Sequence, residues 1–262
     1  MPRSLPRVKL DRSPLAMVLV QARFSSRSDL EPRLPSFRKA CEDLGYPIFR
    51  PSSVRTLNLG PAGPVDAKES LRWDFLDKSQ RWSILLTHEF LMLQTTDYDV
   101  FEDFLSRWKG VLGAACSLGI PVVERLGLRY VDLVQPAPGE PLTDYLVPAL
   151  VGYDPEPESE LERRHHMVAT VLASPHGQLL LRVSPALSST PPDLENIQLK
   201  GISPPSPGAV FLDFDHSSTE VLDFDPDGIE AATDSLHDAP DVLFRKVVTR
   251  KAMTTWGIMS QP

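Results

Sequence analysis

Cysteine is scarce in this sequence, and long apolar runs are missing. Only Cys41 and Cys116 occur among 262 residues. This favours a reducing compartment over a disulfide-stapled secreted domain, and we expect both thiols to be buried. No stretch approaches the ~18 apolar residues of a membrane span. The basic N-terminus is not followed by the apolar region of a secretion signal, so we expect a cytoplasmic protein without a membrane partner.

Basic residues are outnumbered by acidic ones. The sequence contains 27 lysines and arginines and 35 aspartates and glutamates, which gives a formal charge of −8. Such a balance does not provide the general positive surface that follows a phosphate backbone, so nucleic acid is not the expected partner. At 42% hydrophobic residues the chain can bury a sizeable core.

Glycine is sparse as well, at 14 residues, whereas proline reaches 26. Residues 51–64 combine proline, glycine and serine without an apolar period, which predicts a surface loop. Residues 184–208 are also rich in proline, and we expect either a mobile loop or a strap over a surface there.

The first half of the chain, residues 14–120, shows alternating strand patterns and helical stripes. Val18 and Val20 share one face of a predicted strand, and Phe104 and Trp108 share one stripe of a predicted helix. The expected elements are a strand at 15–24, a helix at 35–44, strands at 71–76, 82–87 and 90–94, and a helix over 101–115.

The second half, residues 121–257, repeats this order. The expected elements are a strand at 122–134, a short helix at 142–151, a hairpin of 163–172 with 178–183, a strand at 209–214, and a helix from about 227 to 256. Leu236 and Leu243 keep helical register across Pro240, which predicts one kinked helix, and Asp227 is the expected N-cap.

Both halves therefore follow the order β-α-β-β-β-α, which indicates an internal duplication. The predicted fold class is α+β, with a mostly antiparallel sheet and helices packed on one face. Whether the halves form two units or one continuous domain stays open. The other face of the sheet would remain open to a ligand or a partner.

The richest polar cluster consists of Asp213, Asp215, His216, Asp223, Asp225 and Asp227, and its first three residues are the candidates for chemistry. Carboxylates beside a histidine can bind a divalent cation and activate water, which would suit a metal-dependent hydrolase or nuclease-like enzyme. The alternative is structural, since acidic residues at a strand-helix junction commonly cap and solvate it. We favour the structural interpretation and predict no metal site.

Arg23 and Arg129 occupy similar places in the first strand of each half. Each needs an acceptor or water. They could anchor the sheet internally, or they could present two guanidinium groups to a small anionic ligand. No nucleotide-loop, nucleophile-elbow, zincin, dinucleotide or paired-cysteine motif occurs, so we expect no cofactor and lean against catalysis.

Several segments carry a family resemblance that covers nearly the whole chain. They are 77–82, 93–98, 127–130 and 236–238, together with Phe244, Lys251, Trp256 and Gly257. The sequence resembles a sporadically distributed bacterial family that is defined only by an automated sequence model and has no assigned function. The resemblance implies no catalytic residue. Sporadic distribution is typical of accessory or defence-linked genes.

Together these observations favour a non-enzymatic binding protein of an accessory or immunity type, whose partner is another protein. The metal-dependent enzyme and the anionic-ligand binder remain as alternatives. The sequence does not indicate an oligomeric state.

Overall fold

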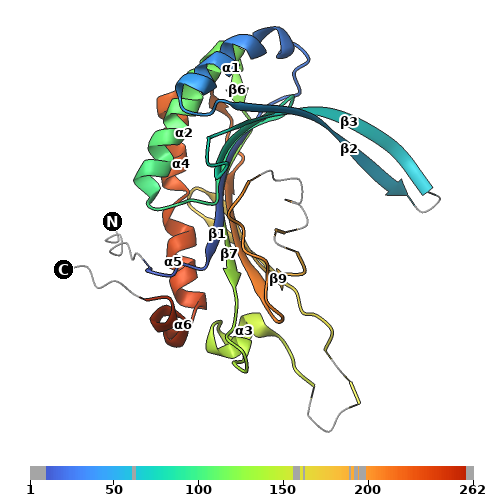
Figure 1. Ribbon diagram of the computed structural model, residues 1–262, viewed down its shortest axis with the longest axis vertical. Helices are drawn as coiled ribbons and strands as arrows, with labels where there is room; N and C mark the ends of the chain where they lie inside the picture. The colour runs from blue at the N-terminus through green and yellow to red at the C-terminus, as the bar shows by residue number, and fades with distance from the viewer. Residues whose placement is uncertain are drawn as a thin grey trace.

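The computed structural model describes residues 10–60, 63–155, 160–161, 163–188, 190–191, 194 and 199–257. For residues 54–70 only the backbone is described. Helices pack on one face of a large antiparallel sheet (Figure 1), which confirms the predicted α+β class. No helix in these residues is both long and apolar enough to cross a bilayer.

Within the described ranges, nine strands form the sheet, in the order β2-β3-β4-β5-β1-β7-β10-β9-β8, and every neighbouring pair is antiparallel. They are β1 (Leu15–Arg23), β2 (Ile48–Gly60), β3 (Gly63–Leu76), β4 (Trp82–Thr87), β5 (Phe90–Thr95), β7 (Arg125–Val134), β8 (Val168–Ser174), β9 (Gly177–Pro185) and β10 (Val210–Ser218). A separate two-stranded sheet joins β6 (Val122–Val123) to β11 (Leu222–Asp223). The strand at 122–134 is thus divided between two sheets.

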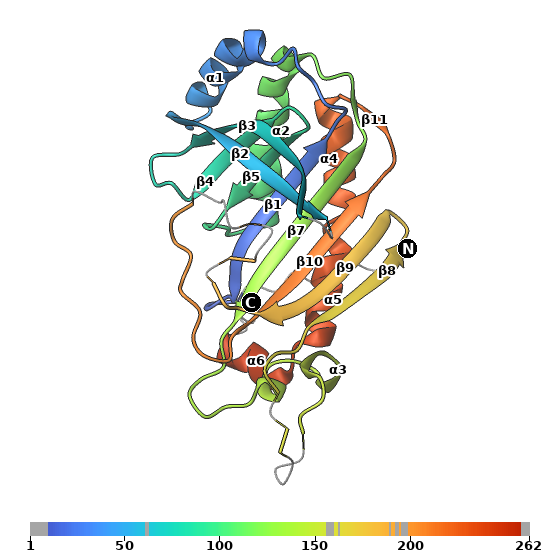
Figure 2. The ribbon, with the colours of Figure 1, turned by 90° about the vertical axis from the view of Figure 1, so that its right-hand side faces the viewer.

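The helices are α1 (Leu34–Asp43), α2 (Phe101–Ala115), α3 (Pro148–Val151), α4 (Pro226–Ser235), α5 (Asp238–Val247) and α6 (Arg250–Thr255), with short 3-10 turns η1 (Glu31–Arg33), η2 (Cys116–Leu118) and η3 (Leu142–Asp144). Helices α2, α4 and α5 lie behind the sheet when its open face is viewed, whereas α1 lies at its upper end and α3 and α6 at its lower end (Figure 2). The single helix expected at 142–151 is therefore two short pieces, with Val147 extended between them.

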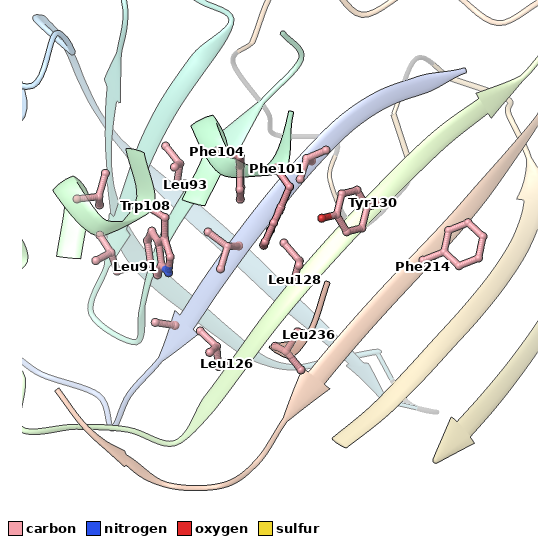
Figure 3. Close-up of a cluster of buried hydrophobic side chains, with 14 of the residues drawn as sticks. Leu91, Leu93, Phe101, Phe104, Trp108, Leu126, Leu128, Tyr130, Phe214 and Leu236 are labelled. Atoms are coloured by element: carbon pink, nitrogen blue, oxygen red, sulfur yellow. The ribbon is translucent and has the colours of Figure 1, made fainter. Parts of the chain in front are cut away.

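The main core lies between the sheet and the helices. Alternation along β7 directs Leu126, Leu128 and Tyr130 toward α2, where they meet Phe104 and Trp108 (Figure 3). The Trp108 indole Nε1 donates a hydrogen bond of 3.2 Å to Thr233 Oγ1, and both side chains are fully buried. This bond ties α2 to α4 across the two halves of the chain.

The prediction of a loop at 51–64 is wrong for its described residues, because 51–60 belong to β2 and 63–64 to β3, which pair as a long hairpin. The hairpin projects from the open side of the sheet (Figure 1). Pro51 suggested a loop, but β2 is an edge strand, and an edge strand tolerates a residue without an N–H group.

The single kinked helix is also wrong. Helix α4 ends at Ser235, and α5 begins at Asp238, so that Pro240 falls in the first turn of α5, where a missing N–H costs no helical hydrogen bond. The N-cap of α4 is Asp225 instead of Asp227, with Asp225 Oδ2 accepting from the Gly228 N–H at 2.8 Å.

The described residues of 184–208, called the strap from here on, include the end of β9 and residues that contact the open face of the sheet. Leu194 packs against the apolar clusters of that face, and the Lys200 N–H donates to Gln80 O at 2.7 Å. The Thr96 hydroxyl donates to Lys200 O at 2.5 Å. The described part of this segment is therefore a strap, the second of the two expected forms.

Candidate functional site

The polar residues singled out in the sequence lie mainly at the centre of the open face. Arg129 on β7 and Asp213 on β10 form a bidentate ion pair, with distances of 2.8 Å from Nε to Oδ1 and 2.7 Å from Nη2 to Oδ2. Both residues are buried, at 6% and 3% exposure. Arg182 on β9 adds a second cation to Asp213 at 2.7 Å. Asp213 is thereby engaged by two arginines.

Asp215 lies two residues further along the same face and pairs with Arg125 at 3.2 Å. This pair is half-buried. Alternation of the strand places Asp213 and Asp215 on one face, as the sequence predicts. Their ion pairs with strand neighbours give both carboxylates a structural role in joining β10 to β7.

His216 lies on the opposite face of β10, which the helices cover. Its Nδ1 is 2.7 Å from Leu236 O and its Nε2 is 2.7 Å from Ser174 Oγ. Burial lowers the pKa of the imidazole. The sheet thus separates His216 from the two aspartates of the predicted cluster. In the part of the chain that the structure describes, no three His, Cys, Asp or Glu side chains are grouped to hold a metal ion.

The two predicted arginines are not brought together either. Arg23 is exposed and lies opposite Arg125 in the β1–β7 ladder, whereas Arg129 lies opposite Leu19. The separation of four residues corresponds to about 13 Å along the strands. The strap also reaches this face, so the two guanidinium groups do not form one exposed anion site.

Among the strands of the sheet whose side chains the structure describes, β8 is the most exposed, and the sequence did not single it out. It forms one edge, and residues 169–173 are all exposed. Val171 is 62% exposed and Leu172 is 38% exposed, and Met167 just before the strand is 66% exposed. An apolar edge strand offers unpaired backbone N–H and C=O groups to another strand.

The opposite edge, β2, carries the features that discourage such pairing. Pro51 and Arg50 lie in β2, and the strand sequence contains a second arginine, Arg55. Proline removes a donor, and charged residues oppose the docking of another strand. Strand β8, with the sequence VATVLAS, has neither. This contrast was visible in the sequence, although the position of β8 at an edge was not.

No protein-family model matches this chain, and no curated protein matches it significantly. These results neither support nor contradict the resemblance to the sporadically distributed bacterial family.

Proposed function

We propose that this protein is a non-enzymatic binding module that engages another protein by accepting an extended segment of that partner along β8. The exposed apolar edge carries the proposal. Main-chain hydrogen bonds to the free side of β8 would supply affinity, and contacts with Val171 and Leu172 would add specificity. The partner strand would extend the sheet from nine strands to ten.

The arrangement of the predicted polar residues supports binding over catalysis. Asp213 and Asp215 are held in ion pairs with arginines on neighbouring strands, and His216 is hydrogen-bonded on the other side of the sheet. A hydrolytic site needs these groups to converge on one reacting centre. The family resemblance supports an accessory or immunity-type role in the bacterial cytoplasm.

The topology supports the proposal of an internal duplication. The first strand of the first half, β1, is hydrogen-bonded to the last strand of that half, β5. Likewise β7 is hydrogen-bonded to β10, the last long strand of the second half. The two first strands then pair with each other, antiparallel, at the middle of the sheet. A two-fold relation between the halves would explain this arrangement.

A charge placed on β8 tests the binding proposal. Val171→Lys puts a lysine at a side chain that is 62% exposed, so the fold should be preserved. Val221→Lys is the matched control, because Val221 is also 62% exposed and lies outside β8. Tagged wild type and both variants are recovered after cross-linking in the cells that make the protein, and stoichiometric partners are quantified by mass spectrometry.

We expect one partner to be recovered with the wild type and with the Val221→Lys variant and to be lost with the Val171→Lys variant. Light scattering on the purified chains measures self-association in parallel. Recovery of the partner with all three proteins would overturn the proposal. The proposal would also be overturned if the wild type formed a dimer that the Val171→Lys substitution dissociates, because β8 would then serve self-association.

A further inference from the structure

A cavity of about 440 Å³ lies on the helix-covered side of the sheet, away from β8. Strands β7 and β10 contribute Tyr130, Asp132 and Phe214 to it, and the start of α2 and helix α5 line its sides. The segment before β1 contributes Leu10 and Ser13. Its volume lies within the range of small-molecule sites in proteins.

Asp132 is the unusual residue of this cavity. It is 4% exposed, it lines the cavity, and its carboxyl group has no hydrogen bond or ion pair among the described residues. Its partners on the neighbouring strands are Leu15 and Leu212, so an apolar side chain would suit the packing better. A buried carboxyl group without a partner costs free energy of folding, which points to a ligand that supplies the partner.

Aromatic rings line the same cavity as the carboxyl group. The imidazole of His237 stacks on Phe101 with ring centroids 3.8 Å apart, and its Nδ1 lies 2.7 Å from the Tyr130 hydroxyl. Tyr98 meets Tyr130 edge-on at 6.1 Å, and Phe214 meets Phe244 at 6.2 Å. These contacts hold the rings in fixed positions around the cavity.

Among the described residues, the charged side chains that line the cavity are acidic. Asp99, Glu102 and Asp241 line it together with Asp132, whereas none of the described lining residues is a lysine or an arginine. Asp241 is paired with Arg245 at 2.6 Å, and Asp99 and Glu102 have partners as well, so Asp132 is the lining carboxyl group that remains for a ligand. An anionic ligand would meet no lysine or arginine among the described lining residues. A cation would gain the Asp132 carboxylate and contact with the aromatic rings that line the cavity.

We propose that this cavity binds a small organic cation, whose ammonium or guanidinium group is held by Asp132 and the surrounding aromatic rings. The inference is independent of the function proposed for β8, because the two sites lie on different elements.

Binding of a cation at this site should be linked to the release of a proton from Asp132. Burial, with a smaller contribution from Asp213 across the sheet, raises the pKa of Asp132 to about 8, so a cation that needs the carboxylate displaces the proton from it at neutral pH. The other titratable groups facing the site are Tyr98, Asp99, Glu102, Tyr130, His237 and Asp241. An Asp132→Asn variant separates the contribution of Asp132 from theirs.

The experiment is calorimetric titration of the full chain with choline, agmatine and 2-phenylethylamine at pH 6, 7 and 8. The neutral counterparts 3,3-dimethylbutan-1-ol and 2-phenylethanol match two of these cations in shape. The variants are Asp132→Asn and, as a control of equal charge change, Asp223→Asn at an exposed position. We expect at least one cation to bind at least tenfold more tightly than its neutral counterpart or, for agmatine, than both alcohols.

That affinity should rise up to tenfold per pH unit from pH 6 to 8, since the carboxylate population rises in that proportion below its pKa. Asp132→Asn should abolish both the affinity and its pH dependence, and Asp223→Asn should change neither. Arg7 and Lys9 precede Leu10 in the sequence and carry the same chemistry. Tighter binding by an Arg7→Gln, Lys9→Gln variant would identify them as competing cations and would support the site.

The proposal is overturned if no cation outcompetes the neutral alcohols in either the wild type or the Arg7→Gln, Lys9→Gln background. It is equally overturned if Asp132→Asn binds the cations as the wild type does.

Discussion

Arg129 and Asp213 are joined across neighbouring strands by two parallel hydrogen bonds, and their side chains are only 7% and 5% exposed. Planar pairing of a guanidinium group with a carboxylate is among the stronger ionic contacts in proteins. The pair explains why a charged residue of each sign is tolerated inside the central strands of the sheet.

Breaking this pair should destabilise the fold. Arg129→Met leaves Asp213 with Arg182 as its remaining cation, so we expect the free energy of unfolding to fall by about 2–4 kcal/mol. Arg125→Met removes the half-exposed pair with Asp215 and should cost less than about 1 kcal/mol. Urea denaturation measures both. If both variants lost the same free energy of unfolding, burial would add nothing to the stabilisation by the Arg129 pair.

The docking of the strap can be tested at Gly201. Its φ is +91°, and an added β-carbon would lie 3.3 Å from Thr96 Oγ1. Gly201→Ala therefore combines backbone strain with crowding, and we expect proteases to cleave within 184–208 several-fold faster. Gly139→Ala is the matched control, because Gly139 has φ +84° with nothing within 4 Å. Unchanged cleavage in Gly201→Ala would count against this contact as an anchor.

The pKa of Asp132 sets a pH dependence of stability. It is 3.8 in an unperturbed aspartate and about 8 in the folded protein, so between these values the folded chain keeps a proton that the unfolded chain has released. The free energy of unfolding should therefore fall as pH rises from about 4 to 8, by at most about 1.4 kcal/mol per pH unit from this group.

Asp132→Asn removes this dependence. Its stability relative to the wild type should increase steadily from pH 5 to pH 8 in chemical denaturation, and Asp223→Asn should follow the wild type throughout. Parallel curves for Asp132→Asn and the wild type would contradict the raised pKa.

The two cysteines should react with a thiol reagent at very different rates. Both were expected to be buried, but only Cys41 is, whereas Cys116 is exposed in η2, where Leu118 takes the buried position. Burial also raises the pKa of the Cys41 thiol. We expect one fast equivalent in the native protein and a second only on unfolding, with the fast one missing in Cys116→Ser. Two fast equivalents would contradict the buried position of Cys41.

Local patterns predicted the elements that carry a strong period. Alternation at Val18 and Val20 identified β1, and helical spacing at Phe104 and Trp108 identified α2. The patterns failed where residue type is ambiguous. Pro51 signals a loop in isolation but is acceptable on a sheet edge, and Pro240 signals a kink unless the helix restarts just before it.

Contacts between distant residues could not be predicted from these patterns. The pairing of Arg129 with Asp213 depends on β10 lying beside β7, and spacing within either strand carries no such information. Asp132 did leave a signal, since it is a single acidic residue inside the otherwise apolar run from Tyr130 to Val134. Its meaning became clear only when the helices were seen to close a cavity over it.

The β1–β7 pairing at the middle of the sheet has a consequence for synthesis on the ribosome. Arg23 at the end of β1 pairs with Arg125 at the start of β7, which is made about 100 residues later. At translation rates of about 5–20 residues per second, the edge of β1 that pairs with β7 remains unpaired for roughly 5–20 s. During that interval the nascent chain exposes an apolar strand edge, and a chaperone that shields such edges would raise the yield of folded protein.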